Sequence, residues 1–216
     1  MKTILKVLVG SRAHGLNDEN SDYDYRAVYV SPTSEILSLG HKYKGTDWYE
    51  GKEDNTSYEI GHFLCLATKC NPSILEVLRA ETITEMDSYG ESLRGLFPHI
   101  WNPQDAFNAF TGYSHNQRKK MLDKKDNRQN KYAVAYVRTL INLISLLKTG
   151  TFSLMVPEMY YKNIKDIRNG KWSFGHILDW AEEFKKNAEK RLENCTHKPN
   201  PEKVNDFLLK VRKENW

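Results

Sequence analysis

The chain has 216 residues and a formal net charge of +4, with 39% hydrophobic and 28% charged residues. A chain of this length forms one compact domain with a buried core, or a small domain with a helical extension. The composition is that of an ordinary soluble protein and no apolar run approaches the ~20 residues that cross a bilayer, so we expect no membrane partner.

The first half of the chain is rich in strand-forming and turn-forming residues. β-Branched, aliphatic and aromatic side chains predict three short strands. These strands are expected at Thr3–Val9, Tyr23–Val30 and Asn55–Ile60. Apolar residues at helical spacing predict the helices between and after them, the last of which begins at a proline. The helices are expected at Ser34–Leu39, at Gly61–Lys69 and from Pro72 to Leu78.

The composition changes near Asn102 and Pro103, after which long helical patterns dominate. Helices are expected at Pro103–Asp123, Asn130–Lys148, Phe174–Arg191 and Pro201–Lys213. Apolar residues at spacings of three and four give the second of these a buried face, and Gly150 is its expected end. We therefore predict an α+β fold: a small mixed β-sheet with flanking helices in residues 1–102, followed by a helical C-terminal region, residues 103–216, packed on that core.

The cysteines and the N-terminal segment indicate the expected location of the chain. Cys65, Cys70 and Cys195 are odd in number and form no C-x-x-C pair, so neither a zinc site nor a disulfide framework is predicted, and a reducing cytoplasm is the expected location. The segment Met1–Leu8 has no adjacent cleavage site, and no targeting segment is expected.

A basic stretch follows in the helical half, opposed only by Asp123 and Asp126. Its members are Arg118, Lys119, Lys120, Lys124, Lys125, Arg128 and Lys131. Such a cluster is suited to a phosphate-rich partner, and the alternative is a solvated helix face.

The segment between the first two predicted strands carries the chemistry. An apolar strand runs into Gly10 and Ser11. Glycine permits a tight turn and the close approach of a phosphate, while backbone N–H groups and the Ser11 hydroxyl can donate to phosphate oxygens. Gly15 allows the following loop to bend back.

Ten residues separate Ser11 from Asp22, and Asp24 follows two positions later on a strand-like segment. Their carboxylates therefore leave the same face and can share hard divalent cations. A two-metal site needs a third carboxylate, for which Glu59 is the candidate on the third strand, because its apolar neighbours make it the residue that points into a polar site. Asp54 and Glu76 are alternatives. A calcium loop is disfavoured because its glycine and distal glutamate are missing at the expected offsets.

These residues are similar to a known signature. A Gly-Ser pair, Asp-x-Asp and a later apolar-Glu-apolar strand resemble the polymerase-beta-like nucleotidyltransferases. Within that superfamily, GSRAHGLNDENSDYDYRAVYV and KCNPSILEVL resemble the RNA repair pathway DNA polymerase beta family, and the similarity continues through KYAVAYVRTLINLISLLKTGTF and IRNGKW. The resemblance implies a nucleotidyltransferase fold in residues 1–102, Mg2+ dependence with Mn2+ as a substitute, and a nucleoside triphosphate donor such as ATP.

Further residues are expected to bind the nucleotide. Arg12 can hold a phosphate or contact the acceptor, and Arg26 is as well explained by a salt bridge. By the superfamily's architecture, Lys120 and Lys131 would bind the triphosphate. The expected acceptor is an RNA end, followed by a protein hydroxyl, as in antitoxin-like minimal nucleotidyltransferases, and then a small molecule. The rival hypothesis is a nucleotide-binding module without turnover.

Overall fold

The computed structural model describes residues 1–40, 46–49, 53–123 and 127–216, apart from the side chains of 46–49, 53 and 54. The chain divides into two compact units. We call the first the sheet unit; it consists of Met1–Lys69, Ser73–Trp101 and Pro199–Trp216. The second, the helical unit, consists of Cys70–Pro72 and Asn102–Lys198. The last segment of the chain, which the sequence pattern groups with the helical half, is thus part of the sheet unit.

A five-stranded mixed sheet forms the centre of the sheet unit, with the strand order β3-β4-β2-β1-β5. The strands are β1 Lys2–Val9, β2 Tyr23–Val30, β3 Thr46–Tyr49, β4 Glu53–Glu59 and β5 Ile83–Met86. Strand β2 pairs with β4 in parallel, and the remaining pairs are antiparallel. The three predicted strands correspond to the three central strands, while the edge strands β3 and β5 were not predicted. The predicted α+β class is confirmed.

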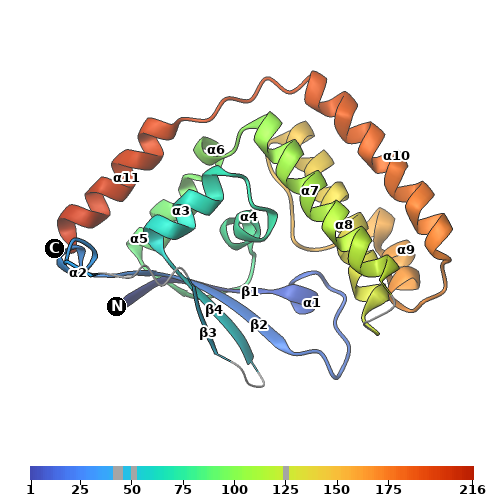
Figure 1. Ribbon diagram of the computed structural model, residues 1–216, viewed down its shortest axis with the longest axis horizontal. Coiled ribbons are helices and arrows are strands. Elements are labelled where there is room, and N and C mark those ends of the chain that lie inside the picture. Colours follow the sequence, from blue (N-terminus) through green and yellow to red (C-terminus); the bar gives the residue numbers. More distant parts are fainter. Residues whose placement is uncertain (41–45, 50–52, 124–126) are drawn as a thin grey trace. The chain divides into compact units, whose positions relative to one another are not determined.

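Three helices of this unit, α3, α4 and α5, lie on one side of the sheet (Figure 1). The helices of the unit are α1 Gly10–Ala13, α2 Thr33–Ile36, α3 Ile60–Thr68, α4 Pro72–Arg79, α5 Ser88–Gly95, α6 Phe97–Ile100 and α11 Pro201–Glu214. The core between sheet and helices includes Val28, Phe63 and Leu75, none of which is exposed to solvent. Burying such side chains is the main source of stability of the unit, at about 1.5–3 kcal/mol each.

The C-terminal helix α11 is attached to the sheet unit by polar contacts as well as by its buried Val204 and Val211. The Asn200 N–H donates to the carbonyl of His99 at 2.9 Å as the helix begins. Where the helix ends, the Thr33 N–H donates to the carbonyl of Asn215 at 2.7 Å. The helix is therefore fixed to this unit at both of its ends.

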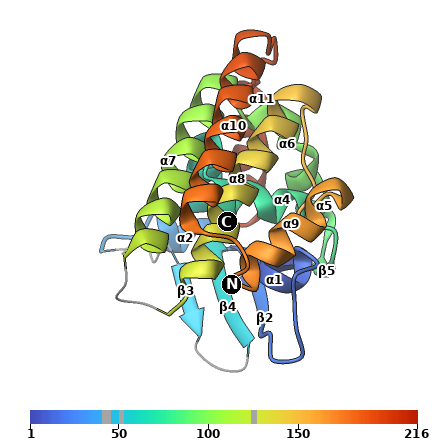
Figure 2. The same ribbon diagram turned by 90° about the vertical axis from the view of Figure 1, so that its right-hand side faces the viewer.

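The described residues of the helical unit form four helices: α7 Pro103–Leu122, α8 Gln129–Thr149, α9 Glu158–Arg168 and α10 Phe174–Glu193. Helix α8 packs against the other three (Figure 2), and its predicted apolar face is buried, for example at Val137 and Leu140. It ends as predicted at Gly150, whose φ of +77° is the left-handed conformation that favours glycine. Helix α9 was not predicted. Within the described ranges, no helix combines the length and apolar character needed to cross a membrane.

Candidate active site

The turn after β1 folds tightly around two glycines. Gly10 and Gly15 both have a φ of +69°, in the left-handed region that L residues with a side chain rarely adopt. Between them, α1 makes a single turn in which the His14 N–H donates to the carbonyl of Gly10 at 3.1 Å. The Leu16 N–H then donates to the carbonyl of Ser11 at 2.9 Å, and the Leu16 side chain is buried. The loop is thereby held close to the end of β1.

Gly10 and Asp24 lie against each other. The antiparallel register pairs Val9 with Asp24, which places Gly10 beside the carboxylate. A Cβ at position 10 would lie 2.7 Å from Cγ of Asp24 and overlap its Oδ2. Glycine is therefore required here for two reasons, the positive φ and the absence of space. The structure brings the Gly-Ser pair and the Asp-x-Asp pair into one place, as the motif predicts.

The two aspartates lie at the start of β2. Asp22 immediately precedes the strand and is exposed, whereas Asp24 is half-buried within it. Within the strand, the stacked rings of Tyr23 and Tyr25 share one face, and Asp24 lies on the other. The approach to Asp22 is ordered by a turn, in which the Asn20 N–H donates to Oδ1 of Asp18 at 3.1 Å and the Ser21 N–H to its carbonyl at 3.1 Å.

Glu59 does not join these two residues. The parallel register pairs Glu59 with Tyr29 and Asp24 with Asp54, so Glu59 lies five positions further along the sheet, about 16 Å at ~3.3 Å per residue. Its side chain is buried, and it caps α3 by accepting a hydrogen bond from the Gly61 N–H at 2.7 Å. The other carboxylate oxygen forms an ion pair with Arg212 at 2.7 Å. These contacts give Glu59 a structural role apart from the aspartate pair, and its role as a metal ligand stays a prediction.

The register identifies a different neighbour of the aspartate pair. Asp54, one of the alternatives from the sequence, is the residue of β4 directly across from Asp24. Its side chain lies outside the part of the chain that the structure describes. Glu76, the other alternative, lies on α4 with Oε2 4.0 Å from Nε2 of His14. Within the described residues, no three His, Cys, Asp or Glu side chains form a cluster that could hold a metal.

The two arginines of the motif make contacts within the sheet unit. Arg12 donates from Nη2 to the carbonyl of Ser21 at 2.7 Å, and its guanidinium lies 3.8 Å from the centre of the Tyr23 ring. Arg26 donates from Nη1 to the carbonyl of Ser73 at 2.7 Å, which links β2 to the first turn of α4. The observed contact of Arg26 is thus with a backbone carbonyl rather than with a carboxylate.

Lys120 and Lys131, predicted to bind nucleotide, lie on α7 and α8 of the helical unit. Both are exposed, and Nζ of Lys120 lies 5.6 Å from the centre of the Tyr132 ring. Of the predicted basic stretch, Arg118, Lys119 and Arg128 are also exposed. Lys124, Lys125 and Asp126 lie outside the described residues. The role of Lys120 and Lys131 in nucleotide binding stays a prediction.

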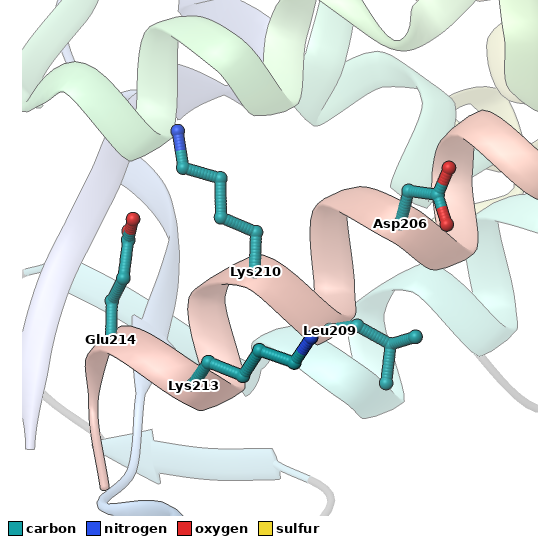
Figure 3. Close-up of a pocket in the computed structure, with 5 residues that line it drawn as sticks. All are labelled: Asp206, Leu209, Lys210, Lys213 and Glu214. Atoms are coloured by element: carbon teal, nitrogen blue, oxygen red, sulfur yellow. The ribbon is translucent and has the colours of Figure 1, made fainter.

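A surface pocket occurs in the sheet unit apart from these residues. It has a volume of about 370 Å³ and is lined by five residues of α11, namely Asp206, Leu209, Lys210, Lys213 and Glu214 (Figure 3). Its charged side chains are of both signs, and no residue of the Gly10–Asp24 turn lines it. We therefore place the candidate active site at that turn and not in this pocket.

Comparison with known proteins agrees with the motif. The family model described as the RNA repair pathway DNA polymerase beta family matches residues 1–196. The match includes the complete β1–β2 turn, β4 and all four helices of the helical unit, and it ends before α11. Comparison with curated proteins found no match.

Proposed function

Because the chain belongs to the RNA repair pathway DNA polymerase beta family, we propose that it is a Mg2+-dependent nucleotidyltransferase that transfers a nucleoside monophosphate from a nucleoside triphosphate to an RNA end. The observation that carries the proposal is the packing of Gly10 against the carboxylate of Asp24. This packing brings the glycine turn and a carboxylate of the Asp-x-Asp pair together, as a site for a metal-bound triphosphate requires.

The residues at this turn fit a divalent cation. Carboxylate oxygens are hard ligands of the kind that Mg2+ and Mn2+ prefer. Gly10 leaves the space that the Asp24 carboxylate occupies, and Asp22, just before the strand, is exposed to solvent. We propose Asp54 as the third carboxylate, on the basis of its register position beside Asp24.

The roles of the protein groups follow from their positions. Gly10 and Ser11 would hold the triphosphate through backbone N–H groups and the Ser11 hydroxyl. One aspartate would accept the proton of the acceptor hydroxyl. The oxygen of that hydroxyl would bond to the α-phosphorus, and the bond between this phosphorus and the pyrophosphate leaving group would break. A bound metal ion would neutralise charge on the triphosphate and lower the pKa of the attacking hydroxyl.

The basic surface of the helical unit supports RNA as the acceptor. Its described basic residues are Arg118, Lys119, Lys120, Arg128 and Lys131, all of them exposed. Exposed cations that are not opposed by an equal number of acidic groups attract the phosphate backbone of a nucleic acid. The RNA repair label of the family agrees with this assignment.

The proposal can be tested with labelled nucleotides. The purified protein would be incubated with each of the four α-labelled nucleoside triphosphates, Mg2+, total RNA and cell protein, and the products separated on a gel. Label on RNA is the expected result, and it should disappear in the Asp22→Asn/Asp24→Asn double variant. Label on a protein band would instead identify protein nucleotidylation. Nucleotide binding without transfer to RNA or protein would contradict the proposed acceptor and favour a non-catalytic module.

A further inference from the structure

Arg12 holds the two residues on either side of Asp22. Its Nη2 donates to the carbonyl of Ser21 at 2.7 Å, and its guanidinium lies over the ring of Tyr23 at 3.8 Å. These contacts join α1 to the segment that enters β2, across a loop in which Asp22 is exposed. Because the Asp22 side chain is exposed, the position of its carboxylate depends on how firmly the neighbouring residues are held.

Residues of the same short helix, α1, thus contact Asp24 and the two residues that flank Asp22. Gly10, at its first residue, provides the surface against which the Asp24 carboxylate lies. Arg12, two residues later, bonds to the backbone before Asp22 and contacts the side-chain ring of the residue after it. A guanidinium suits this task because its planar face can stack on an aromatic ring while its edge donates in that plane, which a lysine ammonium does not do.

The geometry also restricts the way in which Arg12 could contact a phosphate. A phosphate is best held by two parallel N–H donors from one edge of the guanidinium. In this structure Nη2 already donates to Ser21, and Nε is buried from solvent. The edge that contains Nε is therefore closed to a nucleotide, and a phosphate would have to use Nη1 and the second hydrogen of Nη2.

We propose that Arg12 is a positioning residue that holds Asp22 in place for metal binding and does not contact the nucleotide. This inference rests on the proposed function, since it assumes that Asp22 and Asp24 bind a divalent cation. It replaces the nucleotide-binding role predicted for Arg12 from the sequence.

The test measures metal and nucleotide binding separately. Mn2+ binding to the nucleotide-free protein would be followed by the electron paramagnetic resonance signal of free Mn2+. ATP binding would be measured by calorimetry in EDTA, where no metal contributes. The variants are Arg12→Ala, Arg12→Lys, Tyr23→Leu and Tyr23→Phe. Arg94→Ala is the matched control, because Arg94 makes the same kind of bond, from Nη1 to the carbonyl of Ala80 at 2.8 Å, elsewhere in the sheet unit.

Loss of a positioning residue weakens metal binding by roughly 10- to 100-fold. We expect a loss in this range for Arg12→Ala, a smaller loss for Arg12→Lys and Tyr23→Leu, and none for Tyr23→Phe or Arg94→Ala. Added guanidinium ion at concentrations that do not unfold the protein should restore part of the Mn2+ affinity of Arg12→Ala and have no effect on the wild type. ATP affinity in EDTA should stay unchanged. Circular dichroism would establish that each variant is folded. If Arg12→Ala does not fold, Arg12→Lys is used in its place.

Two results would overturn the inference. One is an Arg12→Ala variant that binds Mn2+ as tightly as the wild type. The other is a variant whose loss is confined to ATP affinity in EDTA, which would return Arg12 to phosphate contact. A wild type that binds no Mn2+ and transfers no nucleotide would instead refute the proposed function itself, so the two failures are distinguishable.

Discussion

Arg212, near the end of the chain, forms an ion pair with Glu59 in which Nη1 and Oε1 are 2.7 Å apart. Only 14% of the Arg212 side chain and 4% of the Glu59 side chain are exposed. The pair joins α11 to the residue that ends β4 and caps α3. A helix outside the region matched by the family model is thus coupled to the centre of the sheet unit.

Removal of one partner of this pair should destabilise the fold more than removal of both. Arg212→Met leaves a buried carboxylate without its cation, which costs about 3–5 kcal/mol in such sites. The double variant Arg212→Met/Glu59→Gln should recover much of that loss, because the introduced amide is neutral and its oxygen could still accept from the Gly61 N–H. Urea unfolding would measure the free energies.

Glu59→Gln also tests whether the side chain of Glu59 binds metal. If Glu59 is structural, this variant should bind Mn2+ with wild-type affinity, whereas Asp24→Asn should not. A large loss of Mn2+ affinity in a folded Glu59→Gln protein would restore Glu59 to the metal site.

Local patterns were sufficient for the parts of the site that lie close together in the chain. Gly10, Ser11, Asp22 and Asp24 belong to one strand-turn-strand segment, and their meeting follows from the antiparallel pairing of β1 with β2. The apolar neighbours of Glu59 imitate strand alternation and give no sign of the structural contacts that its side chain makes. The strand ends at Glu59 and Ile60 begins a helix, and its partner Arg212 comes from the far end of the chain, a contact that no spacing rule reveals.

The elements missed from the sequence are those with weak periodicity. Strand β5 is four residues long, and all four are exposed, so it has no buried alternating face to detect. Helix α9 has only Ile164 and Ile167 fully buried among its residues. Helix α8 was predictable because most of its residues on one face are buried and at regular spacing.

Gly10→Ala should abolish metal binding with little change of the overall fold. The new Cβ would overlap the Asp24 carboxylate, and the alanine would also have to adopt a φ of +69°. Gly150→Ala is a control for the second effect alone, because its φ is +77° and nothing lies within 4 Å of the added Cβ. Each substitution should cost about 1 kcal/mol through backbone strain. Only Gly10→Ala should lose Mn2+ affinity and transferase activity; equal behaviour of the two variants would show that the packing against Asp24 has no functional role.

The free energy of unfolding should fall at alkaline pH because of the buried thiol of Cys70. Burial raises the pKa of its thiol from 9.0 to about 11. Because the folded state keeps the proton while the unfolded state releases it, this contribution is complete below pH 9 and is lost as pH rises from 9 to about 11. Two pKa units correspond to roughly 2–3 kcal/mol, which is an upper bound.

The measurement for Cys70 compares wild type with Cys70→Ala. The free energy of unfolding of the wild type should fall more steeply between pH 9 and 11, because tyrosines and lysines titrate in both proteins and cancel in the difference. Parallel curves would contradict the assigned pKa. A thiol reagent at pH 8 should also modify the exposed Cys65 well before the buried Cys70.

RNA binding through the basic surface of the helical unit should depend strongly on salt. Each phosphate contact made with single-stranded RNA contributes about 0.7 to the slope of log K against log salt concentration. If Lys119 and Lys120, both exposed on α7, contact phosphates, their double change to glutamine should reduce that slope by roughly 1.4. The double change Lys186→Gln/Lys190→Gln on α10 removes the same charge from exposed positions of the same unit and should leave the slope nearly unchanged.

Fluorescence anisotropy of a labelled oligoribonucleotide over a salt series would give all three slopes. Equal reductions in both double variants would mean that RNA responds only to net charge, and a flat wild-type slope would argue against RNA as the acceptor.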